Sequence, residues 1–399
     1  MLSDRVRQLK PSPTLAVTQR AAELRAKGKD IVGLGAGEPD FDTPEHIKQA
    51  AKDAMDRGET KYTAVDGTPQ LKTAIIGKFR RDNGLEYTAD QILVSSGGKQ
   101  SYFNLCQAVL NPGDEVVIPA PYWVSYPAMV EIAGGVPVII SAGIETRYKI
   151  TPEQLDAAIT PRTRLVTLNS PSNPTGVAYS QQELKALAEV LVRHPGVLIA
   201  TDDMYEPFLW SGEPFVNVAM IEPSLKDRTL VLNGVSKAYA MTGWRIGYAA
   251  GPADIIKAMK KVQSQSTSNP ASVSQAAAVA ALEGDQACVF RMCEAFRERH
   301  DFVVRALNEI NGLEVVPSDG TFYSFPNCEA AMRNLGLPDD IVFAEYLLIE
   351  AGVAVVPGSA FGAPGHFRVS FATSLANLEK AIERFEKALG RKRETEKAP

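Results

Sequence analysis

A lysine set among small residues is the most promising reactive group in this sequence. Lys237 follows Ser236 in the stretch Asn-Gly-Val-Ser-Lys, directly after an apolar run that is typical of a buried strand. Lysine is rarely buried without a task, and burial beside other cations lowers its pKa, which makes the amine a nucleophile. Ser236 and Arg245 flank it with a hydroxyl and a fork of N–H donors suited to phosphate. A solvated surface lysine is the alternative for this stretch alone.

Acidic and amide side chains follow two other apolar runs. Asp202 and Asp203 follow one run, with Tyr205 three residues after the first acid. A carboxylate at a strand end can hold the proton of a ring nitrogen or bind a metal. The four histidines are scattered and none stands at ligand spacing from these acids, so we predict no metal site. Asn173, in Ser-Asn-Pro-Thr-Gly, can donate to a phenolate-type oxygen; a simple Asn-Pro turn is the alternative.

Two glycine-rich segments add candidate backbone contacts. In Ser-Ser-Gly-Gly-Lys-Gln, Gly98 and Lys99 open a predicted helix, where free N–H groups favour a phosphate. It is not a Walker A loop, because that motif needs a glycine five positions before Gly98 and a Ser or Thr after the lysine, and both are missing. An ordinary strand–helix turn is the alternative. The segment 33–37 has the spacing GxGxG and is followed by Pro39, which argues against a dinucleotide site. Gly37 remains a candidate for close backbone approach to a ligand.

These loops need a sheet that brings them together. The sequence predicts strands alternating with helices, which is typical of βαβ units and a mostly parallel sheet. The predicted strands are 91–95, 115–119, 136–140, 165–169, 197–201, 229–232 and 245–250. The predicted helices between them are 99–110, 122–132, 151–158 and 181–193. Because ligands bind beyond the carboxyl ends of such strands, the loops should meet in one crevice.

The two ends of the chain have a different pattern. A helix is predicted over 12–28, and a second from Thr43 as N-cap, with Pro44 as first helical residue, to about Arg57. A long helix over 273–308, broken near Gly284, leads to short strands at 313–316, 321–325, 353–356 and 366–370, which predict a smaller α+β unit. The charged segment 390–399 is predicted to fray.

Composition narrows the class of protein. The 399 residues are 45% hydrophobic and 22% charged, as in soluble globular proteins. With 42 Lys and Arg against 47 Asp and Glu, the net charge of −5 argues against nucleic acid as a main partner. The four cysteines form no CxxC pair, which indicates reduced thiols, and neither a signal core nor a membrane-length apolar run is present. We therefore expect a cytoplasmic enzyme.

Taken together, these loops resemble the fold-type I pyridoxal-phosphate enzymes, specifically the class I aminotransferases, over nearly the whole chain. The most specific matches are Asn-Pro-Thr-Gly from Asn173, Asp202-x-x-Tyr205, and Ser236-Lys237 with Arg245 eight residues after the lysine. The stretches 37–41, 121–126 and 240–248 resemble the bacterial aspartate aminotransferase subgroup, which includes enzymes that also transaminate prephenate.

The resemblance implies a fold, a domain division and a reaction. The fold is an α/β large domain over 45–297 with a mostly parallel sheet, and a small α+β domain built from 1–44 and 298–399. The reaction is transfer of the amino group of L-aspartate to 2-oxoglutarate by a ping-pong mechanism in a homodimer with shared active sites. Lys237, Asp202 and Tyr205 would be the catalytic residues, and freed Lys237 would move the substrate's α-proton.

Cofactor contacts are implied residue by residue. Lys237 would carry pyridoxal phosphate covalently, Asp202 would pair with its pyridine N–H, and Tyr205 and Asn173 would bind its phenolic oxygen. Trp123 would stack on the ring. The implied phosphate ligands are the backbone of Gly98 and Lys99, the side chains of Ser236 and Arg245, and Tyr62 lent by the neighbouring subunit.

The substrate contacts are implied in the same way. Arg368 would clamp the α-carboxylate, with a backbone contact from Gly37, and Trp123 and Asn173 would also touch the substrate. Some relatives bind the distal carboxylate with an arginine in the stretch matching 263–270, but this chain has none there, so Lys99 is the candidate. Residues 10–14 would close over the site.

Three alternatives stay open at this point. The first is a sister aminotransferase for prephenate or for neutral or aromatic amino acids. The second is a pyridoxal-phosphate C–S lyase. The third is an aminotransferase-like DNA-binding regulator, which would need an added basic helix-turn-helix domain that the sequence does not contain.

Overall fold

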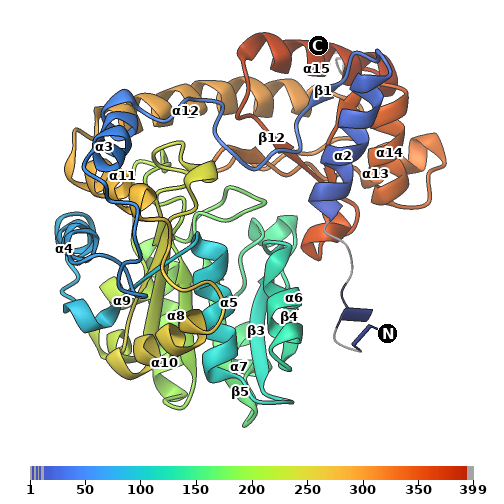
Figure 1. Cartoon of the computed structure of the whole chain (residues 1–399). Coiled ribbons are helices and arrows are strands. Elements are labelled where there is room, and N and C mark those ends of the chain that lie inside the picture. Colours follow the sequence, from blue (N-terminus) through green and yellow to red (C-terminus); the bar gives the residue numbers. More distant parts are fainter. Residues whose placement is uncertain (1, 4–5, 8, 10–12, 393–399) are drawn as a thin grey trace.

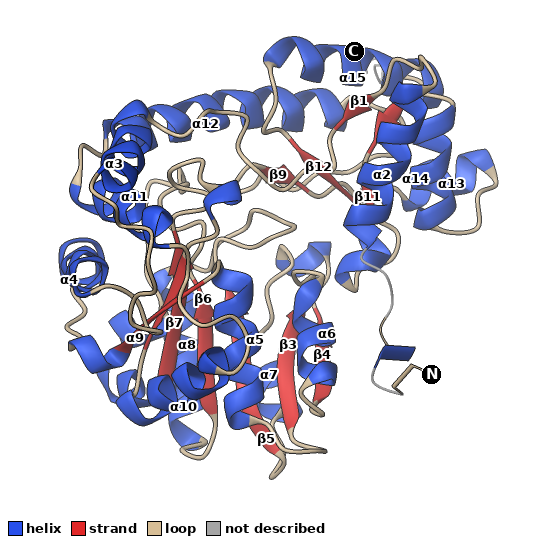
Figure 2. Cartoon of the chain, viewed as in Figure 1, coloured by secondary structure: helices blue, strands red, loops and turns tan. Residues whose placement is uncertain are grey.

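A seven-stranded sheet forms the centre of the protein in a computed structural model, which describes residues 2–3, 6–7, 9 and 13–392. The strand order is β2-β8-β7-β6-β5-β3-β4, and β8 runs antiparallel to both its neighbours while all other pairs are parallel (Figures 1 and 2). The strands are β2 (Ile92–Ser95), β3 (Glu115–Ala120), β4 (Val136–Ser141), β5 (Thr163–Asn169), β6 (Leu198–Asp202), β7 (Thr229–Gly234) and β8 (Gly247–Ala250). The predicted α/β class, all seven predicted strands and their mostly parallel arrangement are confirmed.

Helices cover both faces of this sheet because its strands are apolar on both sides. Val116 packs in a hydrophobic cluster with residues of α5, α6 and α10, and the next residue, Val117, packs in another with residues of α7 and α8. These helices are α5 (Gly98–Val109), α6 (Ser125–Ile132), α7 (Pro152–Ala158), α8 (Gln181–Arg193) and α10 (Ala253–Ser264). Capping boxes set two of their starts, at Thr151 with Gln154 and at Ser180 with Glu183.

The two ends of the chain come together in a smaller unit. β1 (Val32–Gly33) pairs in parallel with β10 (Val353–Ala354), and α2 (Pro13–Ala26) lies beside β10 and β11 (Figure 1). β11 (Val356–Pro357), β12 (Phe367–Ser370) and β9 (Tyr323–Ser324) form an antiparallel sheet. The helices of this region are α12 (Ala287–Asn308), α13 (Glu329–Leu335), α14 (Asp340–Ile349) and α15 (Leu375–Leu389). The predicted domain boundaries stay predictions; the one at 297 falls within α12.

The remaining helices are short or lie at the margin of the large sheet. They are α3 (Glu45–Asp56), α4 (Pro69–Lys78), α9 (Val218–Ile221) and α11 (Ser272–Glu283), with the π-helix η1 (Phe79–Asn83) and the 3₁₀ turns η2 (Ala89–Gln91), η3 (Ile144–Thr146), η4 (Pro223–Arg228), η5 (Thr242–Trp244) and η6 (Gly358–Phe361). Among the described residues, no helix has the length and apolarity needed to cross a membrane.

The local predictions had mixed outcomes, and some were wrong. Pro44, not Thr43, is the N-cap of α3, because the Thr43 hydroxyl instead donates to the Ala240 carbonyl at 2.6 Å. Residues 313–316 form no strand; Glu314 makes only an isolated bridge with Asn327. The predicted break near Gly284 separates α11 from α12. The predicted fraying of 390–399 is wrong for its first residues, because Arg391 bridges to Ile310 and the Lys392 N–H donates to the Glu309 carbonyl. Residues 393–399, and residues 10–12 of the predicted closing segment, lie outside the described residues.

Candidate active site

A cavity of about 300 Å³ opens where β5, β6 and β7 end. It is lined by all the predicted site residues except Tyr62, namely Gly37, Gly98, Lys99, Trp123, Asn173, Asp202, Tyr205, Ser236, Lys237, Arg245 and Arg368. Parallel pairing aligns the strand ends, with Asn169 of β5 opposite Asp202 of β6. Tyr62 lies elsewhere: it is 91% exposed and lines a separate surface pocket beside Arg57 and Ser272.

The Lys237 amine faces the cavity from the loop after β7. Its Nζ donates a hydrogen bond to the Gly37 carbonyl at 2.5 Å, which ties the loop to the amino-terminal segment. Burial lowers the pKa of Lys237 to about 8, and the positive charges of Arg368 and Arg245 add to this lowering against the opposing effect of Glu38. About a tenth of the amine is therefore neutral at pH 7, far more than for an exposed lysine, and this neutral form can act as a nucleophile and proton carrier.

Asp202 ends β6 with its carboxylate buried in the cavity wall. Oδ2 accepts a hydrogen bond from the Tyr126 hydroxyl at 2.5 Å, and Oδ1 accepts one from the Met204 backbone N–H at 3.3 Å. Burial raises the pKa of Asp202, while these two donors and Lys237 act in the opposite direction. Both hydrogen-bond donors are neutral, and no cation forms an ion pair with Asp202 among the described residues. The carboxylate is thus suited to a ligand with a cationic N–H group.

An amide pair holds the turn after β5. Asn169 accepts from the Asn173 backbone N–H at 2.8 Å and donates to the Asp202 carbonyl at 2.8 Å. The side-chain oxygen of Asn173 accepts from Arg368 Nη1 at 2.8 Å. Its amide nitrogen is therefore the atom left to donate to a ligand. The Tyr205 hydroxyl shares a 2.9 Å hydrogen bond with the Tyr323 hydroxyl.

Arg368 is the most enclosed cation of the site. Only 2% of its surface is exposed, and its guanidinium carbon lies 4.4 Å from the ring centre of Tyr323 and 5.0 Å from that of Phe361. Nη2 donates to the Gly35 carbonyl at 2.8 Å, while the buried Nε has no hydrogen-bond partner among the described residues. The aromatic rings fix the plane of a fork of donors that matches a carboxylate.

The start of α5 forms a site for an anion. Gly97 has φ +90°, and a Cβ there would lie 2.2 Å from Arg245 Nη2, so glycine lets the guanidinium rest on the backbone. Arg245 Nη1 donates to the Thr242 carbonyl at 2.8 Å, which holds the side chain beside the first turn of the helix. Backbone N–H groups at a helix start together with an arginine are suited to a phosphate.

Lys99 and Trp123 occupy the mouth of the cavity. Lys99 Nζ lies 5.1 Å from the centre of the Trp123 ring, a cation–π contact. Partial burial lowers the pKa of Lys99, and the charge of Arg245 adds to the effect. Trp123 packs edge-on against Tyr126, with ring centres 5.2 Å apart. A flat ring bound in the cavity would have an aromatic surface beside it.

Sequence reasoning missed several lining residues. Tyr126 lies in the stretch 121–126, from which the family resemblance implies no role for it. Asn169 has a usable signal, because it is an amide at a strand end four residues before Asn173. Tyr323 and Thr242 have no such signal. The contact of Tyr323 with Tyr205 depends on the packing of β9 against a distant turn.

The donors present fit a phosphorylated pyridine aldehyde. The amine of Lys237, the buried carboxylate of Asp202 and the anion site at the start of α5 line the same cavity. Gly247 allows the tight packing at the anion site, because a Cβ there would lie 2.2 Å from the Gly98 nitrogen. Among the described residues, no group of histidine, cysteine and acidic side chains could hold a metal ion.

Comparisons with known proteins agree with this geometry. The family model for aminotransferase class I and II matches residues 29–385. The aspartate/prephenate aminotransferase of Nitrosomonas europaea is 60% identical over 389 residues, which cover 96% of this chain and 98% of that protein.

Solved structures are similar over nearly the full length. The aspartate aminotransferase from Rhizobium meliloti is 53% identical with a TM-score of 0.94, covering 98% of this chain and 99% of that one. The aspartate aminotransferase from Thermus thermophilus with maleate is 47% identical with a TM-score of 0.92, covering 98% of this chain and all of that one.

Proposed function

This chain belongs to the aminotransferase class I and II family, and on that basis we propose that it transfers the amino group of L-aspartate to 2-oxoglutarate with pyridoxal phosphate as cofactor. One observation carries the proposal: the lowered-pKa amine of Lys237, the buried carboxylate of Asp202 and the enclosed fork of Arg368 line the same cavity. Nothing in the site or in the relatives favours the C–S lyase or the DNA-binding regulator.

The binding site of the cofactor is assigned from the side chains and backbone groups that line the cavity. Lys237 would attach it, Asp202 would hold its ring N–H, and Asn173 and Tyr205 would donate to its phenolic oxygen. Trp123 would lie against the ring. Its phosphate would bind the start of α5 at Gly98 and Lys99, with Ser236 and Arg245 supplying side-chain donors. When bound, the cofactor supplies an electron sink for charge that develops on the substrate's α-carbon.

Substrate handling follows from the chain's own groups. Arg368 would bind the α-carboxylate through its two terminal nitrogens, in the plane set by Tyr323 and Phe361. The Lys237 amine would take the α-proton as a general base and return it as a general acid, which its pKa of about 8 supports. The Gly37 carbonyl, which accepts from this amine at 2.5 Å, would orient the amine while it is not bonded to the cofactor.

Dicarboxylate selectivity is assigned to Lys99. No arginine occurs in 263–270, and Lys99 is a cation whose side chain lines the cavity beside Trp123, where it would be available to a distal carboxylate. The Thermus relative was solved with maleate, a dicarboxylate, which supports this substrate class. Prephenate transamination is a further activity suggested by the name of the Nitrosomonas relative.

A shared active site in a homodimer is part of the proposal. Tyr62 lies outside the cavity of its own chain and is 91% exposed, so it is available to a neighbouring subunit. A sedimentation measurement that gives twice the chain mass would support it. So would a weaker affinity of the Tyr62→Phe variant for pyridoxal phosphate. A fully active monomer would refute it. A cytoplasmic location stays a prediction.

The visible spectrum of the purified protein tests the activity. Protein loaded with pyridoxal phosphate should absorb in the visible range, lose that band on addition of L-aspartate and regain it with 2-oxoglutarate. L-alanine and L-phenylalanine serve as matched donors and should act more weakly. Initial-rate plots for the two substrates should be parallel, as for a ping-pong reaction. A protein that takes up no cofactor, or that responds equally to all three donors, contradicts the proposal.

A further inference from the structure

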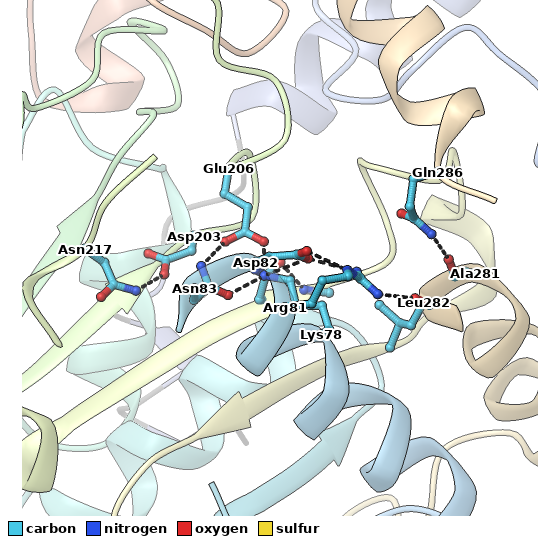
Figure 3. A network of polar contacts seen from close by, with 12 residues as sticks. Lys78, Arg81, Asp82, Asn83, Asp203, Glu206, Asn217, Ala281, Leu282 and Gln286 are labelled. Carbon is cyan, nitrogen blue, oxygen red and sulfur yellow. Dashed lines mark hydrogen bonds and ion pairs between the residues drawn. The ribbon is translucent and has the colours of Figure 1, made fainter. Parts of the chain in front are cut away.

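The turn that follows β6 presents its side chains to two different places. Asp202 and Tyr205 line the cavity, whereas Asp203 and Glu206 do not. These two belong instead to a network of buried polar side chains (Figure 3). We call this group the rear cluster; its members are Lys78, Asn83, Asp203, Glu206 and Asn217. Each is less than 10% exposed, so the cluster is enclosed within the fold.

Asp203 is anchored through both carboxylate oxygens. Oδ1 accepts from the Thr201 hydroxyl at 2.5 Å, and Oδ2 accepts from the Asn217 amide at 2.6 Å. Its backbone N–H donates to the Leu232 carbonyl of β7 at 2.9 Å. Asn217 is itself fixed, since its side-chain oxygen caps α9 at the Met220 N–H. The first half of the turn is therefore tied to β7 and to α9.

Glu206 anchors the second half of the turn to a different element. Its carboxylate forms an ion pair with Lys78 and accepts from the Asn83 amide at 3.1 Å (Figure 3). Lys78 in turn donates to the Asn83 side-chain oxygen at 2.7 Å. Lys78 ends α4 and Asn83 ends the π-helix η1, so these contacts join the turn to a helix that lies outside the sheet.

The charges of the rear cluster balance at neutral pH. Burial, together with the neighbouring charge of Glu206, raises the pKa of Asp203 to about 8, so that this carboxyl group is mainly protonated at pH 7. In the protonated form Oδ1 carries the proton and donates to the Thr201 hydroxyl oxygen, while Oδ2 still accepts from the Asn217 amide. Lys78 pairs with Glu206 and, at 3.8 Å, with the more exposed Asp82, whose charge Arg81 balances. The cluster can hold the turn without placing a net negative charge behind Asp202.

We propose that Asp203 and Glu206 are positioning residues that hold Asp202 and Tyr205 in place for the reaction, an inference that rests on the proposed function. The four side chains belong to one five-residue turn, which is braced internally by the hydrogen bond from the Glu206 N–H to the Asp203 carbonyl at 3.0 Å. A shift at the rear side chains therefore moves the two at the front. A displacement of about 1 Å at reacting groups can cost about 10²-fold in rate.

Four variants of the cofactor-loaded enzyme test this inference. Glu206→Gln removes the charge that pairs with Lys78, and Asp203→Ala removes both anchoring oxygens. Asp203→Asn keeps the shape and neutrality of the protonated acid. Glu115→Gln is the matched control: Glu115 is also a buried carboxylate paired with a basic residue, Arg162, but it lies at the start of β3, away from the cavity.

Two readouts separate positioning from stability. One is kcat and KM for L-aspartate, measured well below the thermal midpoint of each variant. The other is the pH midpoint of the cofactor's visible absorbance without substrate, which reports the contacts around the cofactor whether or not aspartate is the substrate. Glu206→Gln and Asp203→Ala should lower kcat about 10- to 100-fold and shift the absorbance midpoint. Asp203→Asn and Glu115→Gln should leave both within about twofold of the parent enzyme.

The outcomes are distinct. Unchanged kcat and absorbance midpoint in both Glu206→Gln and Asp203→Ala overturn the inference, even if their thermal midpoints fall. An equal loss of kcat in Glu115→Gln also overturns it, because general destabilisation would then be the cause. An equal loss of kcat in Asp203→Asn overturns it as well, because the cause would then be the negative charge of an ionised Asp203. If Glu206→Gln does not fold, Asp203→Ala against Asp203→Asn decides alone. An inactive parent enzyme refutes the proposed function, while the absorbance midpoints still test the positioning.

Discussion

Replacing Lys237 by methionine should stabilise the cofactor-free protein at neutral pH. The pKa of this amine is about 8 in the folded chain, against its ordinary value of 10.5. The unfolded chain therefore binds the proton more tightly, and charging Lys237 opposes folding. This penalty is fully present below pH 8 and disappears as the pH rises through 10.5.

The size of the effect follows from those two values. The difference corresponds to about 3 kcal/mol of unfolding free energy, as an upper limit, because water in the cavity screens the amine. With about 2.1 cal/mol/K of unfolding entropy per residue, this equals about 3–4 °C in the thermal midpoint. Methionine has a similar length and no charge, so most of the penalty should be absent in Lys237→Met.

The assay is the thermal midpoint of cofactor-free parent and variant at pH 7 and pH 10, at one protein concentration. The advantage of Lys237→Met should be largest at pH 7 and should mostly vanish by pH 10. Lys29→Met, at an exposed lysine, is the control and should show no pH-dependent difference. A difference between Lys237→Met and the parent that stays constant from pH 7 to pH 10 would refute the reasoning, because it would mean that the amine titrates alike in both states.

Three further outcomes concern turnover. Lys99→Ser should raise the KM for aspartate about 10- to 100-fold, the worth of a hydrogen bond to a charged group, and should barely change the KM for phenylalanine; equal changes would count against Lys99. Arg368→Met should lower kcat/KM for every amino acid by about 30-fold or more, since the α-carboxylate is common to all, and a loss confined to aspartate would contradict that role. Asp202→Asn should lower kcat about 10²- to 10³-fold with the fold intact, as judged by circular dichroism, because a neutral amide cannot stabilise a cationic ring nitrogen; normal kcat would exclude the assignment.

The central part of the molecule was predictable because its signals are local. Each of Asn173, Asp202 and Lys237 stands just after an apolar run, and the parallel sheet brings such positions to one edge. Contacts that depend on the packing of distant segments could not be predicted in this way. The Tyr205–Tyr323 hydrogen bond and the contact of Arg368 with Gly35 join segments more than 100 residues apart. The local sequence around these residues does not indicate which distant residue each one contacts.

The helices that the sequence analysis did not predict are α4, α9, α10, α13, α14 and α15. The last two were missed for different reasons. The segment 340–349 is apolar on most sides, with Phe343 and Leu347 buried and Ile341 exposed, so it lacks the periodic pattern that marks a surface helix. α15 does carry that pattern, with buried Leu378, Ile382 and Phe385 after a capping Ser374, and could have been found.

The pairing of β1 with β10 sets an order in which the protein can be completed during synthesis. Val32 meets Val353, about 320 residues later, and the same amino-terminal segment carries Gly37, whose carbonyl receives the Lys237 amine. At about 5–20 residues per second, a ribosome needs roughly 15–60 s to make the missing partner strand. During that interval the large sheet can already form while β1 lacks its partner strand. A nascent chain should therefore be unable to enclose the cofactor until translation has passed Val353.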